Sequence, residues 1–364
     1  MRLSLDKVEL EIARLWEEEA RRSRATRVEL MTLVALVSES HLLDRARDVV
    51  QRVARAYPLR TVLASWTDSD RPAITAEVAL HRPSPEGAAC GDAISVEATG
   101  SAREWLPENA ERLALPDLPM CVWWVGDLPD YDRLFDRMAR AADLVVVNSE
   151  EMDLRDLEKL STVSARVRHT CAFSDLAWIR LRTMQELVAR FFDDAAGREC
   201  VRSLERVTIE FSPRGGEKDV ASTQAGLLFG WMANALSMRA EGVQWKRGPT
   251  WGEATLGKVV ARFVHHPRTD VPPGSILRVS IECDGARFDI ERQDDPRVLR
   301  WSRETPGAPV SPQTIGVDIA EEAGLLVRCL ERPRRDFLFE NSLHLGSRIV
   351  RPIAPRLSSL PRPL

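Results

Sequence analysis

The sequence is poor in the residues and motifs that many enzymes depend on. Of its 364 residues, six are histidine and six are cysteine. No two cysteines form a C-x-x-C pair, which argues against a structural zinc site and a thioredoxin-like redox motif. The phosphate-binding loops G-x-x-x-x-G-K-[ST] and G-x-G-x-x-G are missing, as are H-E-x-x-H and G-x-S-x-G. We therefore predict no catalytic residues, no metal site and no cofactor.

Neither sign of charge dominates, because 51 Lys and Arg face 55 Asp and Glu. The lack of a basic surplus argues against a nucleic-acid partner. No apolar run reaches the roughly 18 residues that a membrane-spanning helix needs, so we expect no membrane association. Asp6, Glu9 and Glu11 interrupt the region where a signal peptide would have its apolar core. These absences predict a cytoplasmic protein with reduced cysteines, in which Cys121 and Cys283 pack as small buried hydrophobes.

The chain has enough apolar sequence for a normal core, since 44% of its residues are hydrophobic and 29% are charged. Predicted strands and helices are mixed in both halves. We therefore expect an α/β (α+β mixed) protein of two domains, each with a mixed or largely parallel sheet and helices packed on it. The predicted domains are an N-terminal α/β domain over 1–195 and a C-terminal α/β domain over 196–350, followed by a Pro-rich tail over 351–364.

Hydrophobic periodicity predicts the individual elements. In the first domain the predicted helices cover 3–21, 38–57, 100–113, 131–142, 153–161 and 174–192, and the strands cover 27–37, 60–66, 73–81, 93–99, 120–124, 144–147 and 167–170. In the second domain the predicted helices cover 222–238, 316–330 and 336–349, and the strands cover 204–211, 242–246, 255–265, 275–284 and 286–291. Ser38 and Ser174 are predicted N-caps, and Gly215 with Gly216 is a predicted tight turn.

Residues 115–149 predict a strand, a helix and a second strand, and both strands are short and wholly apolar. This pattern is typical of a parallel sheet, whose strands receive ligands at their carboxyl ends. The strand-end ligand candidates are therefore Trp124, Asp127, Asn148 and Ser149. The alternative is that Trp123 and Trp124 pack against two different helical layers and that the polar residues only form turns.

A second candidate set follows shortly after in the chain. Asp175 and Trp178 are three residues apart, which places them on one face of the predicted helix, and Arg180 follows them. Because Trp and Arg are favoured at interface hot spots, Asp175, Trp178 and Arg180 are partner-binding candidates. The alternative is that the carboxylate stabilises a helix start and the indole packs on the sheet.

Several motifs, taken in order, resemble a known family. They are Arg27–Leu36, Tyr57–Arg60, Cys90–Ile94, Leu118–Trp124, Ala142–Ser149, Asp175–Leu181 and Gly230–Ala233. In this ordered set the chain resembles the glucose-6-phosphate dehydrogenase assembly protein family, OpcA. It departs from the family at Val125, where a Pro is usual, and at Asn148, where an Asp is usual. It also has Arg-Thr-Met-Gln-Glu over 182–186, where the family has Thr-Pro-Trp-Arg-Glu.

The resemblance implies a factor without catalytic activity. Such a factor would bind glucose-6-phosphate dehydrogenase, act as its allosteric activator, and so support NADPH production in the oxidative pentose phosphate pathway. The alternative is an enzyme or sensor domain that acts on a sugar phosphate or nucleotide at the carboxyl ends of the N-domain sheet. Its candidate residues are Asp127, Asn148, Ser149, Asp175 and Arg180, a set without the His or Lys that acid–base catalysis often uses.

Overall fold

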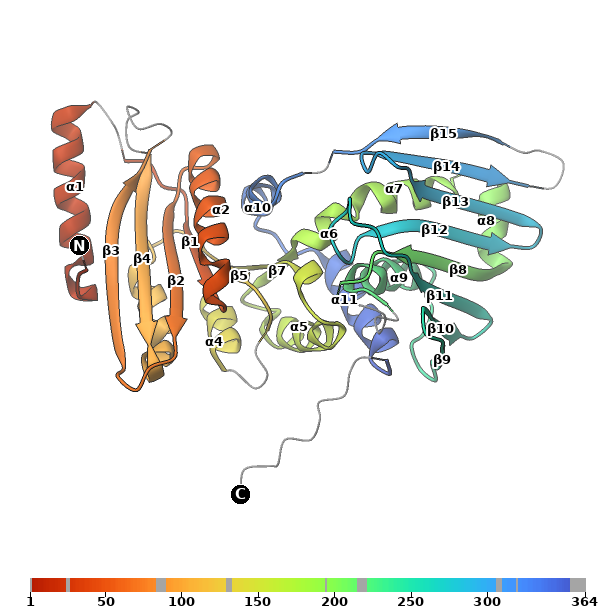
Figure 1. Ribbon diagram of the computed structural model, residues 1–364, viewed down its shortest axis with the longest axis horizontal. Coiled ribbons are helices and arrows are strands. Elements are labelled where there is room, and N and C mark those ends of the chain that lie inside the picture. The colour runs from red at the N-terminus through yellow and green to blue at the C-terminus, as the bar shows by residue number, and fades with distance from the viewer. Residues whose placement is uncertain are drawn as a thin grey trace, which may run out of the picture. The chain divides into compact units, whose positions relative to one another are not determined.

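The chain forms two compact units, each built around one sheet (Figure 1). The first unit comprises Met1–Asn148, Val163–Leu176 and Ala320–Asp336, and the second comprises Ser149–Thr162, Ala177–Ile319 and Phe337–Leu364. The computed structural model describes residues 2–23, 27–82, 90–128, 133–193, 195–214, 221–305, 310–318 and 320–353. Over these residues the fold is mixed α/β, as predicted. The boundary expected between 195 and 196 stays a prediction.

The sheet of the first unit is largely parallel. Its strands are β1 (Thr32–Val37), β2 (Arg60–Thr67), β3 (Ala73–His81), β4 (Gly91–Thr99), β5 (Met120–Val125), β6 (Leu144–Val147) and β7 (Ala172–Asp175). Their order is β3-β4-β2-β1-β5-β6-β7, and β3 runs antiparallel to β4 whereas the other neighbouring pairs are parallel. Every residue of β1, β5 and β6 is buried, as expected for strands covered on both faces.

Helices and short 3-10 turns cover this sheet. They are η1 (Leu5–Lys7), α1 (Val8–Arg22), η2 (Ser40–Leu42), α2 (Leu43–Ala56), η3 (Gly100–Trp105), α3 (Leu106–Leu113), α4 (Arg133–Ala141) and α10 (Glu322–Glu331). Helix α2 buries Ala46, Val49, Val50 and Val53, whose spacing gives one apolar face. Helix α1 packs beside the edge strand β3, as Figure 1 shows.

The sheet of the second unit is largely antiparallel. Its strands are β8 (Leu204–Phe211), β9 (Gln244–Arg247), β10 (Trp251–Leu256), β11 (Val259–His265), β12 (Ile276–Cys283), β13 (Ala286–Arg292), β14 (Val298–Glu304) and β15 (Val310–Gly316). The order is β15-β14-β13-β12-β8-β11-β10-β9, with β8 and β11 parallel. Along β8 the side chains of Val207, Ile209 and Phe211 are buried while their neighbours are more exposed, so this sheet buries one face more deeply than the other.

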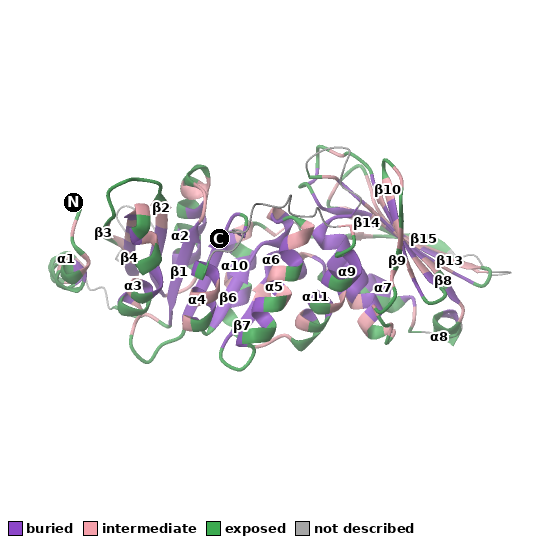
Figure 2. Cartoon of the chain, turned by 90° about the horizontal axis from the view of Figure 1, so that it is seen from below, coloured by how far each residue is buried: buried purple, intermediate pink, exposed green. Residues whose placement is uncertain are grey.

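The remaining helices are α5 (Leu154–Val167), α6 (Leu176–Arg180), α7 (Arg182–Arg190), α8 (Ala195–Arg202), α9 (Thr223–Ala235) and α11 (Phe337–Val350), and η4 (Ser149–Glu151) is a short 3-10 turn. Helix α9 is buried along most of its length and is largely purple in Figure 2. A Cβ atom added at Gly230 would lie 2.3 Å from the carbonyl oxygen of Ser342 on α11. The two helices therefore pack backbone against backbone. None of the described helices combines the length and the apolar character that crossing a bilayer demands.

The structure corrects several predicted elements. The strand predicted over 167–170 is wrong, because α5 continues to Val167 and the strand β7 begins at Ala172. The single helix predicted over 174–192 is also wrong, since Ser174 and Asp175 end β7 and the helices α6 and α7 follow. Pairing of β7 with β6 overrides the local helical pattern. Ser38 is not an N-cap, because its hydroxyl instead donates to the carbonyl oxygen of Val125.

The second unit contains further corrections. The strand predicted over 255–265 is a hairpin of β10 and β11 that turns at Gly257, where φ is +60°. Strands β14 and β15 were not predicted, and the helix predicted from 316 begins at Glu322. The turn predicted at Gly215 and Gly216 and the tail from 354 onward lie outside the described residues.

One pair of cysteines also departs from the prediction. Cys283 forms a disulfide with Cys200, with their Cα atoms 5.4 Å apart, so the expectation that it packs as a reduced hydrophobe is wrong. Helix α8 carries Cys200 to the end of β12, across a sequence separation of 83 residues. Cys121 is buried in β5 with a free thiol, as predicted.

Candidate functional site

The strand order of the first sheet reverses between β1 and β5, and in doubly wound sheets a nucleotide is received in the crevice at such a point. Here Ser38 continues the parallel pairing of β1 with β5. The amide nitrogen and the hydroxyl of Ser38 lie 3.1 Å and 3.0 Å from the carbonyl oxygen of Val125. Gly126 has φ +99°, and a Cβ atom there would lie 2.4 Å from Ser38 Oγ and 3.2 Å from a Glu39 carboxylate oxygen. The crevice thus presents a carboxylate instead of a glycine-rich phosphate loop.

The tryptophan pair beside this crevice is part of the core. Trp123 and Trp124 are both fully buried, which confirms that part of the packing interpretation. The ring centroid of Trp124 lies 5.1 Å from that of Phe135 on α4 and 6.2 Å from that of Trp66 on β2. Its indole N–H donates to the backbone oxygen of Asp127 at 3.1 Å, whereas the residue Asp127 itself is exposed.

The remaining strand-end candidates, Asn148 and Ser149, are buried, and so is the partner-binding candidate Asp175. In the first unit Asn148 follows β6 and Asp175 ends the neighbouring strand β7, where it pairs with Val147. In the second unit Ser149 begins η4, and its carbonyl oxygen accepts a hydrogen bond of 2.6 Å from the hydroxyl of Thr223 at the start of α9. The sequence placed Asn148 at a strand end, as the structure shows, whereas its assignment of Asp175 to a helix is wrong.

Trp178 and Arg180 lie in α6, and both find partners within the second unit. The ring of Trp178 is buried, with its centroid 5.6 Å from that of Phe339. Arg180 forms an ion pair with the buried Glu150, which also accepts a hydrogen bond from the side chain of Gln224. The expectation that Asp175 and Trp178 share a helix face is wrong, because the helix begins only after Asp175.

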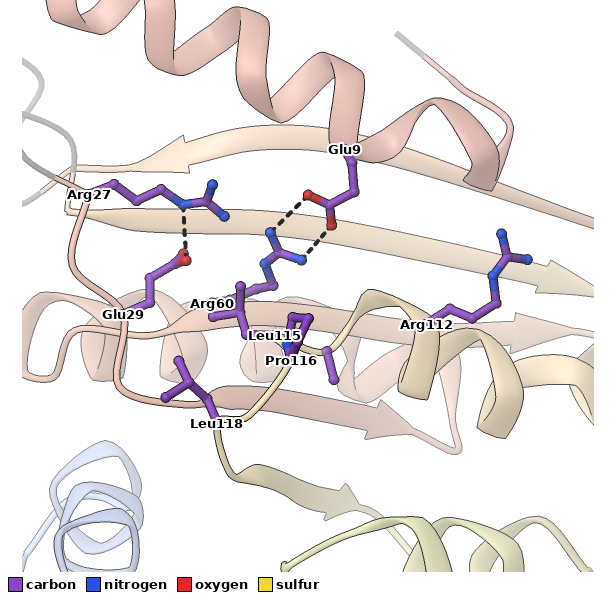
Figure 3. Close-up of a pocket in the computed structure, with 9 residues that line it drawn as sticks. Glu9, Arg27, Glu29, Arg60, Arg112, Leu115, Pro116 and Leu118 are labelled. Atoms are coloured by element: carbon purple, nitrogen blue, oxygen red, sulfur yellow. Dashed lines mark hydrogen bonds and ion pairs between the residues drawn. The ribbon is translucent and has the colours of Figure 1, made fainter.

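A pocket of about 490 Å³ lies near the amino ends of β1, β2 and β5 in the first unit (Figure 3). It is lined by Glu9, Arg27, Glu29, Arg60, Arg112, Ala114, Leu115, Pro116 and Leu118. Sequence reasoning missed this site. The signal that could have revealed it is Arg60, the one charged residue of an otherwise uncharged strand.

Arg60 is the centre of the polar network beside this pocket, and only 2% of its side chain is exposed. One edge of the guanidinium donates to the buried carboxylate of Asp92, with nitrogen–oxygen distances of 3.0 and 2.9 Å. The other edge donates to the two carboxylate oxygens of Glu9 at 2.6 and 3.2 Å. The carbonyl oxygen of Leu113 accepts a further hydrogen bond of 2.8 Å. The charge of Arg60 is thus fully paired, which makes its burial tolerable.

A second arginine and a second glutamate extend the network. Arg27 pairs with both Glu29 and Asp92, and the carboxylate of Glu29 also accepts the backbone N–H of Asp92 at 3.0 Å. Burial, and then repulsion from the Asp92 carboxylate, raise the pKa of Glu29 above its ordinary value. Arg112, at the end of α3, is exposed at the pocket mouth.

A smaller pocket of about 250 Å³ lies beside α2, with Ser65, Ser95 and Glu97 among its lining residues. No His, Cys or Lys lines either of these two pockets of the first unit. Among the described residues, no group of three or more His, Cys, Asp and Glu could hold a metal ion. The arrangement can pair charges and hold an anion, but these pockets offer neither a nucleophilic cysteine nor a histidine base.

Two family models match successive parts of the chain, and both describe a glucose-6-phosphate dehydrogenase subunit. The model of its N-terminal domain matches residues 50–163, and the model of its C-terminal domain matches residues 171–343. The chain belongs to the OpcA family. Members of this family are thus described as part of a dehydrogenase assembly.

Two cyanobacterial relatives carry the name OxPP cycle protein OpcA. The protein of Synechocystis sp. is 28% identical over 197 residues, which cover 52% of this chain and 39% of the relative. The protein of Nostoc punctiforme is 28% identical over 209 residues, which cover 55% of this chain and 42% of the relative. The chain therefore matches about two fifths of the length of these curated relatives.

Solved structures are similar to the chain at low sequence identity. The aldose-aldose oxidoreductase from Caulobacter crescentus is 11% identical with a TM-score of 0.50, covering 90% of this chain and 96% of that one. The 3-ketoreductase KijD10 from Actinomadura kijaniata is 13% identical with a TM-score of 0.48, covering 87% and 95%. At such identities the likeness to the first of these concerns the fold alone.

Proposed function

We propose that this OpcA-family member is a non-catalytic factor that binds glucose-6-phosphate dehydrogenase and raises its activity or changes its oligomeric state. In this proposal it acts in the cytoplasm and supports NADPH production in the pentose phosphate pathway. Support comes from the two family models, which name a subunit of that dehydrogenase, and from the relatives named for the OxPP cycle.

The observation that carries the non-catalytic part is the Glu39 carboxylate, which lies near Gly126 at the switch point between β1 and β5, where a cofactor-binding sheet has a glycine-rich loop. A hydride-transferring enzyme of this fold class would need the crevice at this point for the cofactor's phosphates. The hydrogen bonds of Ser38 to Val125 keep β1 and β5 paired up to this point, and the Glu39 carboxylate beside it would repel a phosphate. A shared fold with oxidoreductases is therefore compatible with a protein that has no cofactor of its own.

Activation without chemistry requires that the factor bind one state of the dehydrogenase more tightly than another. A tenfold shift between two states needs only about 1.4 kcal/mol of differential affinity, so a modest interface suffices. Among the partner-binding candidates, Arg180 keeps 25% of its side chain exposed, whereas Asp175 and Trp178 are buried. We therefore expect Arg180 to contribute a contact and Trp178 to support its helix from within the second unit.

The test mixes the protein with the dehydrogenase of the same organism. Size-exclusion chromatography and initial rates across a concentration series should reveal a complex and altered kinetics. The absence of both at tens of micromolar, where a Kd near 1 µM would give nearly complete binding, would reject the proposal.

Variants then locate the contact. Arg180→Lys, which keeps the charge opposite Glu150, should weaken the complex, since Lys cannot form the planar fork of Arg. The matched control is Arg190→Ala on α7, which removes an exposed arginine outside the candidate set. Equal binding by the Lys variant, with an unchanged melting temperature, would move the contact elsewhere.

A further inference from the structure

We propose that the pocket at the amino ends of β1, β2 and β5 binds the oxyanion group of a small metabolite, a phosphate ester or a carboxylate, on the guanidinium of Arg60. Glu9 occupies that position in the structure and acts as a built-in competitor. The proposed ligand site is independent of the proposed function, because it does not require that the protein bind the dehydrogenase.

The first argument is the different status of the two carboxylates that hold Arg60. Asp92 is wholly buried and also accepts the indole N–H of Trp16 at 2.7 Å, so it is a fixed part of the core. Glu9 lies on the helix α1 with 58% of its side chain exposed, and Figure 3 shows it reaching toward Arg60 from above the strands. One edge of the guanidinium is therefore held permanently, and the other is held by a group that can swing into water.

The second argument is geometry. The two oxygens of Glu9 bind two guanidinium nitrogens in the paired arrangement that arginine also makes with carboxylates and phosphates of ligands. An incoming oxyanion can take the same place without moving Arg60. Because Asp92 and Leu113 already fix the guanidinium, little side-chain entropy is lost when the ligand exchanges with Glu9.

The third argument is charge balance. Arg27, Arg60 and Arg112 face the carboxylates of Glu9, Glu29 and Asp92, so the site is balanced while Glu9 is in place. When Glu9 leaves, one positive charge remains, and burial together with Asp92 further favours the neutral form of Glu29. The side chain of Arg112 forms no hydrogen bond or ion pair with another described side chain, although its charge helps to lower the pKa of Asp6, and it is exposed at the pocket mouth.

The fourth argument is size. A volume of about 490 Å³ lies within the range of about 300 to 1,000 Å³ that is usual for small-molecule sites, and it exceeds what a bare anion fills. Leu115, Pro116 and Leu118 form an apolar wall beside the arginines. The site therefore suits an organic molecule with one anionic end.

The test is isothermal titration calorimetry with the full chain at constant ionic strength. Inorganic phosphate and acetate probe the two head groups, and glucose 6-phosphate probes a phosphate with an organic body. Glu9→Gln removes the competitor and should tighten binding of at least one probe by about tenfold, because the neutral amide pairs more weakly with Arg60. Arg112→Ala should weaken the same probe several-fold.

The control is Glu17→Gln, which removes an exposed carboxylate from the same helix α1 and should leave binding as in the unaltered protein. Circular dichroism and melting temperature verify that each variant is folded. Tighter binding of phosphate than of acetate assigns the site to phosphate esters, and the reverse assigns it to carboxylates. The proposal fails if no probe binds the Glu9→Gln protein at about 10 mM, or if Glu9→Gln and Glu17→Gln bind alike.

Discussion

Single residues in this protein differ sharply in what their burial costs. Arg60 keeps its charge in the interior because Asp92 and Glu9 pair both edges of its guanidinium. The buried side chain of His81 instead avoids carrying a charge. Thr61 Oγ1 lies 2.7 Å from Nε2 of His81, and burial lowers the pKa of His81 to about 4, so the imidazole is neutral at pH 7.

His81 should make stability depend on pH. Its pKa falls from 6.5 to about 4 on folding, so between these values the unfolded chain binds more protons than the folded one. The free energy of unfolding should therefore decrease by up to about 3 kcal/mol as pH falls from 6.5 to 4, with no contribution above that window. Urea titrations of His81→Gln should lack this decrease, whereas His41→Gln, at an exposed position, should retain it.

Trp124 should contribute to stability through its packing. Trp124→Ala removes a fully buried ring that touches Phe135 and Trp66, so it should cost about 3–5 kcal/mol of unfolding free energy. Trp105 is 53% exposed, and Trp105→Ala should change the same quantity by less than about 1 kcal/mol. Equal melting temperatures for the two variants would contradict the core assignment.

Between elements, α9 and α11 approach each other closely. This approach depends on glycines at both helices. The carbonyl oxygen of Ser342 approaches Gly230, and a Cβ atom added at Gly346 would lie 2.5 Å from the carbonyl oxygen of Gly226. Helix α9 has apolar residues on all sides, which is typical of a helix that is buried all round.

Gly230→Ala should force α9 and α11 apart. The added methyl group would meet backbone atoms of Ser342 and Gly346, which cannot rotate away as a side chain can. We expect a loss of about 1–3 kcal/mol in unfolding free energy by chemical denaturation. Gly324→Ala on α10 is the control, since open space surrounds that position and alanine favours the helix by about 0.5–1 kcal/mol. A stabilised Gly230→Ala protein would show that the helices adjust freely.

At the scale of the whole molecule, a fold shared with an aldose-aldose oxidoreductase is combined with the carboxylate of Glu39 at the strand switch point. We expect the purified protein alone to show no reduction of NADP with glucose 6-phosphate. The Glu39 carboxylate lies near Gly126 at the switch point, where a cofactor's phosphates would have to bind, and it would repel them. Turnover near 1 s⁻¹, ordinary for an enzyme, in a preparation shown free of the host dehydrogenase would overturn this expectation.

Local sequence signals determined much of the fold. The strands over 73–81, 144–147 and 204–211 were predicted with the bounds that the structure shows, because alternation and apolar runs with turn residues beside them are local properties. The start of α9 after Ser222 was determined likewise, and the Ser222 hydroxyl accepts the N–H of Ala225 as an N-cap does. The ordered motifs also sufficed to indicate the family.

Only the tertiary structure decided the features that join distant segments. Arg60 acquires its partners from α1 and β4, which are separated from it by 51 and 32 residues, and no local pattern encodes that meeting. Cys200 and Cys283 form a disulfide although they are 83 residues apart, and again no local pattern encodes their meeting. Residues 172–175 form a strand because β6 offers hydrogen-bonding groups beside them, although the sequence predicted that Ser174 and Asp175 begin a helix. Pairing, burial and charge neutralisation depend on which segments meet, and folding alone determines that.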